Sequence, residues 1–429
     1  MVLAGGGAFL SSKVSLIFDS VLKSKFHSAL TKKVSETSAE KKSLITPTFI
    51  FAWLVNFAQF SVFYLLVTIM ALYAVEQFQA SDTAGGFASS AFVVGATIAR
   101  LFSGYIVDAM GRKRSLVVSL IVVTIAMALY FPAQSLPLLF GVRILHGLGY
   151  AVASTAVMAV AQSVIPDHRR AEGTGYFALG TTLATAFGPA AGLAIVHSAG
   201  YNSVFVVALT LTVVALCLGL IVKAPAHETR SVTFSLGNIM HPGVAPFGVF
   251  ILFVGVAYTG IITYLNGYSA DAGLEKGASY FFLTYALVSL VLRFVLGKVQ
   301  DRRGDNIIIY SSLVFFIAGL CVLAAAAADW QVVLAGALVG IGYGSILPAG
   351  QAIAVRLVPV HEMGAGISTF FLLLDVGIGF GPILLGQIIS ATSFSTMYWL
   401  LAGLMAVAAV VYFFVHGRKD VARGDVRYE

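Results

Sequence analysis

The chain has 429 residues, of which 59% are hydrophobic and 10% are charged, and its formal net charge is +7. An average soluble protein has roughly 25% charged residues, so this composition excludes two or three ordinary soluble domains. It also excludes disorder for most of the chain, because disordered segments are poor in apolar residues. The composition is typical of a helical membrane protein.

Twelve apolar segments follow one another along the chain, each close to the roughly 20 residues that a spanning helix needs. They lie near residues 48–72, 84–107, 115–131, 136–158, 173–197, 202–223, 244–268, 278–300, 307–327, 331–354, 364–390 and 394–416. The connections between them are short. The sequence therefore predicts an all-α membrane protein with twelve transmembrane helices and no soluble domain between them.

The segment before the first predicted span, residues 1–45, mixes apolar and basic residues. The apolar ones recur at helical spacing among lysines, at Leu10, Val14, Phe18, Val21, Leu22, Phe26 and Leu30. This pattern suits a basic amphipathic helix on the membrane surface. A loosely ordered tail or a targeting segment explains it equally well.

Lys and Arg residues sort to one side of the membrane under this assignment. Of the 26, only Lys276 falls in a loop on the opposite side, and Arg100, Arg143 and Arg293 lie within spans. Basic residues are concentrated in cytoplasmic loops, so both termini are predicted to be cytoplasmic. The net positive charge then reflects topology rather than nucleic-acid binding, and the predicted location is the cell (inner) membrane.

A constant offset of 193 residues (293 − 100) lays one half of the sequence on the other. It pairs Arg100 with Arg293, Gly104 with Gly297, Asp108 with Asp301, Gly111 with Gly304 and Gly188-Pro189 with Gly381-Pro382. Such matches across several spans indicate a duplication of six spans with parallel topology, which places a transporter's substrate site between the halves. The predicted units are a tail (1–45), a six-helix bundle (46–223), a cytoplasmic linker (224–243), a second, pseudo-symmetric six-helix bundle (244–416) and a tail (417–429).

Several motifs resemble those of the major facilitator superfamily. Residues 104–114 read GYIVDAMGRKR, similar to that family's signature after the second span, and residues 297–304 echo it as GKVQDRRG. Residues 143–149, RILHGLG, resemble a fourth-span motif associated with proton coupling. Gly180 and residues 188–192, GPAAG, resemble the fifth-span motif of the twelve-span drug:proton antiporter branch. The resemblance implies a transporter of two bundles that rock about a central site.

The sequence departs from the family pattern at several positions. Asp305 stands where the second signature would have a basic residue, and Ala109 stands where the first usually has Arg. The first span lacks the acidic residue of many exporters of cationic drugs and has Asn56 and Gln59 instead. These departures argue against broad export of cationic drugs.

Two carboxylates are predicted to latch the cytoplasmic side. Each is well placed to meet the positive end of a neighbouring helix. By family analogy Asp108 would meet the eleventh span near Gly364, and by the symmetry of the repeat Asp301 would meet the fifth span near Gly173. The same gate would include Arg100, Gly104, Gly111, Arg112, Arg293, Gly297 and Gly304, whose glycines let helices approach closely. The alternative is that the basic loops only fix topology.

Glycine and proline recur in the outer halves of the fifth and eleventh spans, at Gly188, Pro189, Gly192, Gly381 and Pro382. Proline removes a backbone donor and bends a helix, so these residues are predicted to form bends that open or seal an outer gate. Ordinary packing of kinked helices is the alternative, since both residues are common in membrane spans.

Two ionisable residues within the spans break the repeat symmetry. Asp375 corresponds to Thr182, and Arg143 corresponds to Gly336. A lone carboxylate at mid-membrane is the candidate for reversible protonation, with a permanent helix–helix hydrogen bond as the alternative. Arg143 is a candidate for an organic anion, for the proton site or for a structural backbone contact.

Other polar side chains complete the candidate site. His146 lies one turn after Arg143 and titrates near neutral pH when exposed, although a buried neutral histidine fits equally well. Asn56, Gln59 and Tyr264 are candidates for substrate contact, or for bonds to other helices.

The leading functional prediction is a secondary active transporter that couples protons to export of a small organic molecule. Three membrane arginines against one acid favour an anionic or zwitterionic substrate. Uptake of a metabolite such as an organic acid or sugar, by symport or facilitation, is the main alternative, and a non-transporting sensor or scaffold is another. We find no metal-ligand cluster, cofactor or ATP-binding motif, no pattern for an enzyme, and expect a monomer in the bilayer.

Overall fold

The computed structural model describes residues 43–225 and 240–424. A boundary after Leu44 separates the N-terminal segment from a compact unit that begins at Ile45. The predicted amphipathic helix lies outside the described residues.

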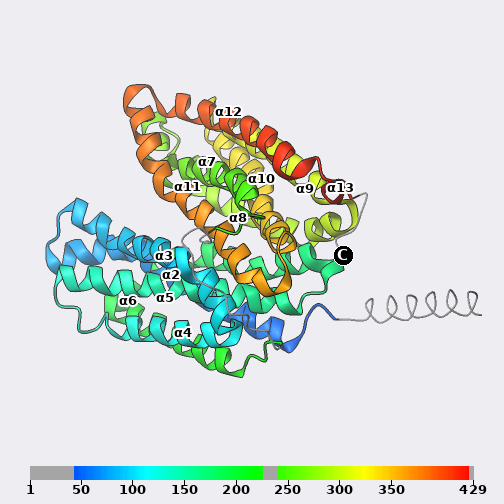
Figure 1. Cartoon of the computed structure of the whole chain (residues 1–429). Coiled ribbons are helices and arrows are strands. Elements are labelled where there is room, and N and C mark those ends of the chain that lie inside the picture. The colour runs from blue at the N-terminus through cyan, green and yellow to red at the C-terminus, as the bar shows by residue number, and fades with distance from the viewer. Residues whose placement is uncertain (1–42, 226–239, 425–429) are drawn as a thin grey trace, which may run out of the picture. The chain divides into compact units, whose positions relative to one another are not determined.

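Long helices make up this unit (Figure 1). In the first half they are α2 (Pro47–Phe78), α3 (Asp82–Met110), α4 (Arg112–Ala128), α5 (Leu136–Val164) and α6 (Arg170–Ile221). In the second half they are α7 (Ala245–Ala272), α8 (Glu275–Arg303), α9 (Asp305–Ala324), α10 (Asp329–Arg356), α11 (Met363–Ala391) and α12 (Phe394–Tyr412). A π-helical turn (Phe413–Gly417) and the short α13 (Asp420–Arg423) follow, and no strand occurs in the described ranges.

The fifth and sixth predicted spans are the two arms of α6. Gly200 has φ +79° and ψ 173°, which breaks the helical path between them, and glycine tolerates this φ because it has no Cβ. Counted this way, the described residues contain twelve long helical segments, as predicted. Within residues 43–225 and 240–424, ten helices are long and apolar enough to cross a membrane, and α4, with 17 residues, is shorter than these.

Helix boundaries reproduce the sequence repeat. The starts of α3 and α8 differ by 275 − 82 = 193 residues, those of α5 and α10 by 329 − 136 = 193, and those of α6 and α11 by 363 − 170 = 193. The turns into α4 and α9 use Gly111 and Gly304, with φ of 86° and 87°. The duplicated sequence therefore encodes a duplicated fold with the same turn chemistry.

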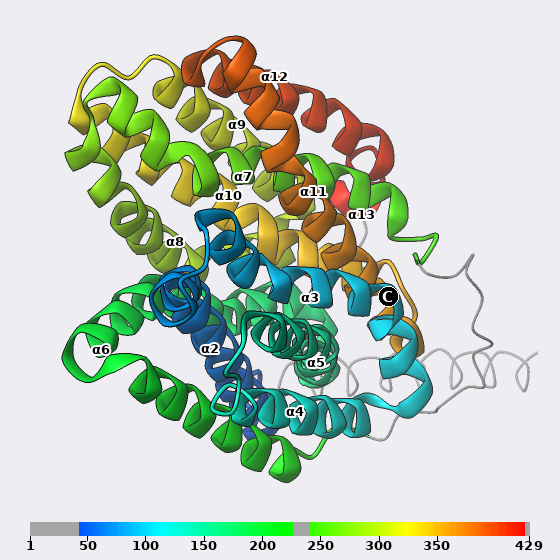
Figure 2. The same ribbon diagram turned by 90° about the vertical axis from the view of Figure 1, so that its left-hand side faces the viewer.

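The same packing scheme occurs in both halves (Figure 2). In the first half α2 packs on α6 and α3 on α5, and in the second α7 packs on α11 and α8 on α10. Two further contacts join the halves: α3 packs on α11, and α8 packs on α6. The repeat relates these two interfaces, so they are built from equivalent helices and can be compared residue by residue.

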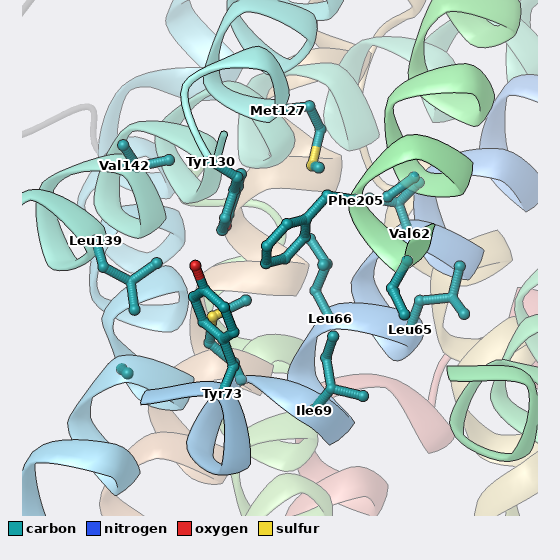
Figure 3. Close-up of a cluster of buried hydrophobic side chains, with 14 of the residues drawn as sticks. Val62, Leu65, Leu66, Ile69, Tyr73, Met127, Tyr130, Leu139, Val142 and Phe205 are labelled. Atoms are coloured by element: carbon teal, nitrogen blue, oxygen red, sulfur yellow. The ribbon is translucent and has the colours of Figure 1, made fainter. Parts of the chain in front are cut away.

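Apolar side chains fill the interior of the first half (Figure 3) and cover the outer face of α8 in the second half. Val62, Leu66 and Ile69 of α2 pack with Tyr130 and with Phe205 of α6, and all five are at most 1% exposed. On the outer face of α8, apolar residues are instead exposed at a spacing of four: Leu283 is 63%, Leu287 60% and Val291 60% exposed. A helix whose outer face is also apolar is expected to be surrounded by lipid rather than by water.

Candidate functional site

One end of the described unit carries three pairs or runs of basic residues, at 112–114, 169–170 and 302–303, and we call it the basic end. Asp108 lies at this end of α3 and is 4% exposed. Its two carboxylate oxygens accept hydrogen bonds from the backbone N–H groups of Gly364 (2.9 Å) and Ala365 (2.8 Å), in the first turn of α11. A carboxylate there satisfies otherwise unpaired donors and complements the helix dipole.

Asp301 makes the repeat-related contact at the other interface. Its oxygens accept hydrogen bonds from the backbone N–H groups of Ala171 (2.9 Å) and Glu172 (2.8 Å), in the first turn of α6. The structure thus places both carboxylates against the helix starts that the sequence indicated, with the second contact slightly before Gly173. Each carboxylate ties one half to the other.

Glycines allow the backbones to meet at these ties. A Cβ built on Gly104 would lie 2.7 Å from the Cα of Ala365, and one on Gly297 would lie 2.6 Å from the Cα of Glu172. Real Cβ atoms do not approach backbone this closely, so only glycine permits the observed contact.

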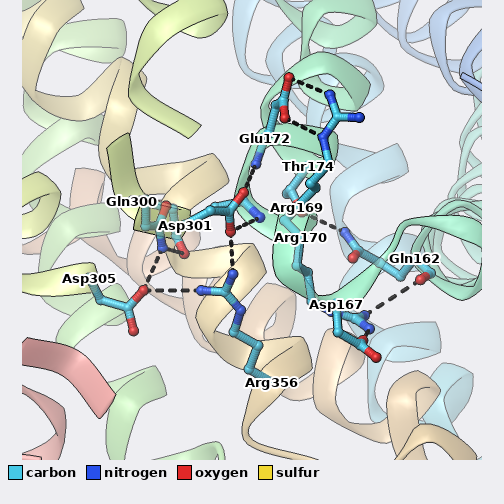
Figure 4. A network of polar contacts seen from close by, with 12 residues as sticks. Gln162, Asp167, Arg169, Arg170, Glu172, Thr174, Gln300, Asp301, Asp305 and Arg356 are labelled. Atoms are coloured by element: carbon cyan, nitrogen blue, oxygen red, sulfur yellow. Dashed lines mark hydrogen bonds and ion pairs between the residues drawn. The ribbon is translucent and has the colours of Figure 1, made fainter. Parts of the chain in front are cut away.

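Asp305 stands where the first half has the basic residue Arg112, and a basic residue from another helix, Arg356 of α10, lies beside it (Figure 4). Arg112, its repeat equivalent, donates a hydrogen bond to the carbonyl of Val360 in the other half. In the second half, Arg356 of α10 lies between two acids: it donates to Asp301 and, at 3.3 Å, to Asp305. Arg356 has no basic counterpart, since its repeat equivalent is Ser163.

Asp305 is fully buried and has further partners. Gln300 donates to it at 2.8 Å, and the His416 Nε2 lies 2.9 Å from its second oxygen. Burial of an acid requires such compensation, because an unpaired buried charge is costly.

Glu172 adds an ion pair beside the Asp301 tie and lies just outside the predicted span. Arg169 donates to its carboxylate at 2.7 and 2.8 Å, and Lys298 of α8 lies 3.6 Å away. Burial acts to raise the pKa of Glu172, but the hydrogen bonds and charge of Arg169 outweigh it, so the pKa lies below its ordinary value.

The centre of the α3–α11 interface holds an ion pair between a buried arginine and a partly exposed acid. Arg100 Nε donates to Asp375 Oδ2 at 3.1 Å, and the guanidinium lies 4.6 Å from the centre of the Phe371 ring. Its Nη1 donates to three acceptors on α5: Ala151 O (3.1 Å), Ser154 Oγ (2.9 Å) and Thr155 Oγ1 (3.0 Å). Arg100 lies ten residues from the basic end of α3 (110 − 100) and Asp375 twelve residues from that of α11 (375 − 363), so the sequence contains a signal that places them at similar depth.

Arg293 occupies the equivalent place in the α8–α6 interface. Its Nη2 donates to Thr182 Oγ1 at 3.1 Å. Arg293 of α8 thus contacts α6 in the other half, as Arg100 of α3 contacts α11.

Arg143 is not the cation beside Asp375. It is fully buried within the first half, where it donates to the carbonyls of Ala88 (3.0 Å) and Ser89 (2.7 Å) and to the Tyr130 hydroxyl (3.4 Å). Of the three roles left open by the sequence, the structure shows the backbone contact. It joins α5 to α3.

His146 and the polar residues of α2 are enclosed as well. The His146 Nδ1 lies 3.3 Å from the Tyr130 hydroxyl, and its ring packs on Phe92. Asn56 donates to Thr181 of α6 at 3.2 Å, while the Gln59 amide nitrogen is buried with no hydrogen-bond partner in the described ranges. Asn56 and His146 therefore contact other helices of their own half in this conformation.

Tyr264, a candidate for substrate contact, instead joins two helices. Its hydroxyl donates to the carbonyl of Pro382 at 2.6 Å. Pro382 cannot donate to the carbonyl of Ile378, and Thr259 of α7 donates to that carbonyl at 3.0 Å instead. The predicted proline bend is thus a site of close α7–α11 packing.

Helical backbone continues through both predicted kinks. Residues 189 and 382 lie inside α6 and α11, and the non-helical residue inside α6 is Gly200. A Cβ on Gly188 would lie 2.5 Å from Tyr64 Cβ, one on Gly192 would lie 3.0 Å from the carbonyl of Leu65, and one on Gly381 would overlap Thr259. These glycines serve close packing against α2 and α7.

Comparison with known proteins agrees with this architecture. The family model for the Major Facilitator Superfamily matches residues 52–328 and 277–427. The uncharacterized MFS-type transporter YhhS of Escherichia coli (strain K12) is 22% identical over 373 residues, which cover 83% of this chain and 89% of YhhS. A Burkholderia mallei (strain SAVP1) relative, also described as an uncharacterized MFS-type transporter, is 24% identical over 75% of this chain and 82% of its own length.

Solved structures show the same fold. The human organic anion transporter MFSD10 (TETRAN) superposes with a TM-score of 0.74 at 13% identity, over 85% of this chain and 98% of that one. The proton:xylose symporter XylE superposes with a TM-score of 0.69 at 14% identity, over 89% and 98%. Because the family model covers most of its length, this chain belongs to the Major Facilitator Superfamily and is a multi-pass membrane transporter.

Proposed function

We propose that the protein couples proton movement to export of a small organic molecule by alternating access, with Asp375 as the proton carrier. The observation that carries the proposal is the Arg100–Asp375 ion pair between the halves. Arg100 lies ten residues from the end of α3 (110 − 100), or about 15 Å along the helix. The predicted second span ends near residue 107, so Arg100 lies inside the hydrocarbon core, which is about 30 Å thick.

Protonation of Asp375 would release one half from the other. The neutral acid no longer attracts the guanidinium, whereas Arg100 keeps its acceptors Ala151, Ser154 and Thr155 on α5 of its own half. The proton therefore loosens α11, while Nη1 of Arg100 keeps its three acceptors and only Nε loses its charged partner. Asp375 is also the more accessible partner, since its side chain is 25% exposed and that of Arg100 is 5% exposed.

The proposed orientation places the basic end in the cytoplasm, by the positive-inside rule. Asp108 and Asp301 then close the cytoplasmic side in this conformation, and their release would open it. The gate proposed from the sequence, with Arg112 and the paired glycines, fits these contacts.

An anionic or zwitterionic substrate is our preferred class, because the spans contain three arginines and one clear acid. The similarity to a human organic anion transporter agrees with this preference. A proton symporter for uptake is the second candidate, since the solved neighbours include a proton:xylose symporter. No enzymatic activity is proposed, and we expect a monomer.

The test is proton movement in sealed liposomes that contain the purified protein. Organic anions, zwitterions, sugars and cationic dyes are added under an imposed pH gradient. Substrate-triggered proton flux opposite to the substrate supports export by antiport, and flux in the same direction supports symport. Substrate flux with no proton flux would contradict proton coupling.

A further inference from the structure

The two interfaces between the halves differ next to their repeat-related arginines, where the α3–α11 interface has the acid Asp375 and the α8–α6 interface has Thr182. The offset of 193 places Arg293 where Arg100 lies and Thr182 where Asp375 lies. Both arginines reach across to that position, Arg100 to a carboxylate at 3.1 Å and Arg293 to a hydroxyl at 3.1 Å. Arg293 thus repeats the geometry of the ion pair without its counter-charge.

The side-chain partners of Arg100 on α5 and α11 are also missing around Arg293. Ala151, Ser154, Thr155 and Phe371 correspond to Gly344, Leu347, Pro348 and Ala178. The two side-chain acceptors are therefore replaced by residues that cannot accept a side-chain hydrogen bond. In agreement, the Nε and Nη1 atoms of Arg293 are buried without any hydrogen-bond partner in the described part of the chain.

A pocket takes the place of these missing side chains. It is lined by Arg293 and Ser289 of α8, by Gly344 and Pro348 of α10 and by Gly175 of α6, and in this conformation it has room for about one water molecule. The nearest acid on the same helix, Asp301, lies eight residues away (301 − 293), or about 12 Å, and is held by Arg356. Tyr285 and Tyr343 are near enough to interact electrostatically with the guanidinium, and neither brings a negative charge at neutral pH.

We propose that Arg293 binds the carboxylate of an organic anion, which takes the place that Asp375 occupies at the equivalent interface. A buried guanidinium without a counter-charge is costly and marks a functional site in a membrane protein. The planar fork of Arg matches a carboxylate, and the Asp375 pair shows that this fold accommodates one at this position. The anion would bridge α8 and α6, so that it contacts both halves as an alternating-access substrate must. This inference rests on the proposed transport function and specifies its substrate class.

The first measurement needs no ligand and compares two repeat-related variants. Thermal unfolding of the purified protein in detergent is recorded for wild type, Arg100→Gln and Arg293→Gln. Arg100→Gln is expected to lower the unfolding temperature, because it leaves Asp375 unpaired. Arg293→Gln is expected to leave it unchanged or raise it, because it removes an unpaired charge. A decrease for Arg293→Gln as large as that for Arg100→Gln would overturn the proposal.

The second measurement uses benzoate, succinate and N-acetylglycinate, each compared with its neutral amide and with inorganic phosphate. At least one carboxylate should raise the unfolding temperature of wild type while its amide does not. Arg293→Gln should raise the half-saturating concentration of that carboxylate by about a hundredfold. Thr182→Asp supplies an internal carboxylate, so it should abolish the response and raise the unfolding temperature of the ligand-free protein.

Three results would overturn the carboxylate site: equal protection of wild type and Arg293→Gln, protection by phosphate alone, or no protection by any of the three carboxylates. Transport assays separate this inference from the proposed function. Proton-linked transport restricted to neutral or cationic compounds would leave proton coupling intact and refute the anion site. Carboxylate binding that depends on Arg293 without any transport would support the site and refute the transport proposal.

Discussion

Asp108 and Asp301, related by the sequence repeat, each accept two backbone hydrogen bonds from the first turn of a helix in the opposite half. The two contacts lie at the same end of the protein and close it there. Because the two residues are related by the repeat, the same type of carboxylate contact joins the halves at both interfaces.

Asp108→Asn is expected to shift the protein toward a state in which the basic end is open. Asparagine accepts one of the two bonds but has no charge, so the closed state loses about 1.5–3 kcal/mol. Spin labels at Lys113 and Arg302, both exposed and in opposite halves, would report a longer distance between them. Asp271→Asn is the control, because Asp271 is an exposed acid in the last turn of α7, away from the basic end. An unchanged distance distribution would refute the role of Asp108 as a latch.

Gly104→Ala is expected to prevent full closure of the same end. The added Cβ would lie 2.7 Å from the Ala365 Cα, so α3 and α11 must separate. Transport should fall by about tenfold or more, as expected when positioning is disturbed by about an ångström. Gly86→Ala is the matched control, because it lies on the same helix with nothing within 4 Å of the new Cβ and has the same gain in helix propensity. Equal activity of the two variants would contradict this interpretation.

Arg356→Met is expected to destabilise the second half. Asp301 and Asp305 have side chains only 5% and 0% exposed, and removing their shared cation should cost about 3–5 kcal/mol. Thermal unfolding should show a large decrease for Arg356→Met. The double variant Arg356→Met, Asp305→Asn should recover part of it, because one uncompensated charge is gone. Additive losses in the double variant would show that the two residues are not coupled.

Acid pH is expected to remove the contribution of Glu172. Its pKa lies below the ordinary value of 4.5, so the folded state favours the charged form, and the stabilisation is fully present above pH 4.5. It is lost as the pH falls through the lower pKa of the folded state. The difference in unfolding temperature between wild type and Glu172→Gln should therefore be constant from pH 7 to 5 and shrink below 4.5. A difference that grows with acidity would have the wrong sign.

The positions of Asp108, Asp301 and their glycines could be predicted because the two halves of the sequence can be compared with each other. The offset of 193 identified Asp108, Asp301 and their glycines, and the chain's helix boundaries follow the same offset. Family analogy then indicated the helix start near Gly364 for Asp108, and the repeat symmetry indicated the one near Gly173 for Asp301.

The partners of buried charges were harder to predict. Arg356 compensates for Asp305 from a different helix, at a position whose equivalent is Ser163, so no repeat pattern marks it. Arg143 and Arg100 look alike in sequence, and only the packing of α11 against α3 decides which one meets Asp375. A periodic pattern gives the face and depth of a side chain, whereas its partner depends on which helices from distant parts of the chain are neighbours.

The proposed coupling role of Asp375 is tested most directly by comparing two modes of transport in liposomes. Exchange of labelled for unlabelled substrate needs no net proton movement, whereas accumulation driven by a pH gradient does. Asp375→Asn should retain exchange and lose gradient-driven accumulation, because a neutral side chain cannot carry the proton. Gradient-driven accumulation at the wild-type level in Asp375→Asn would contradict the proposal.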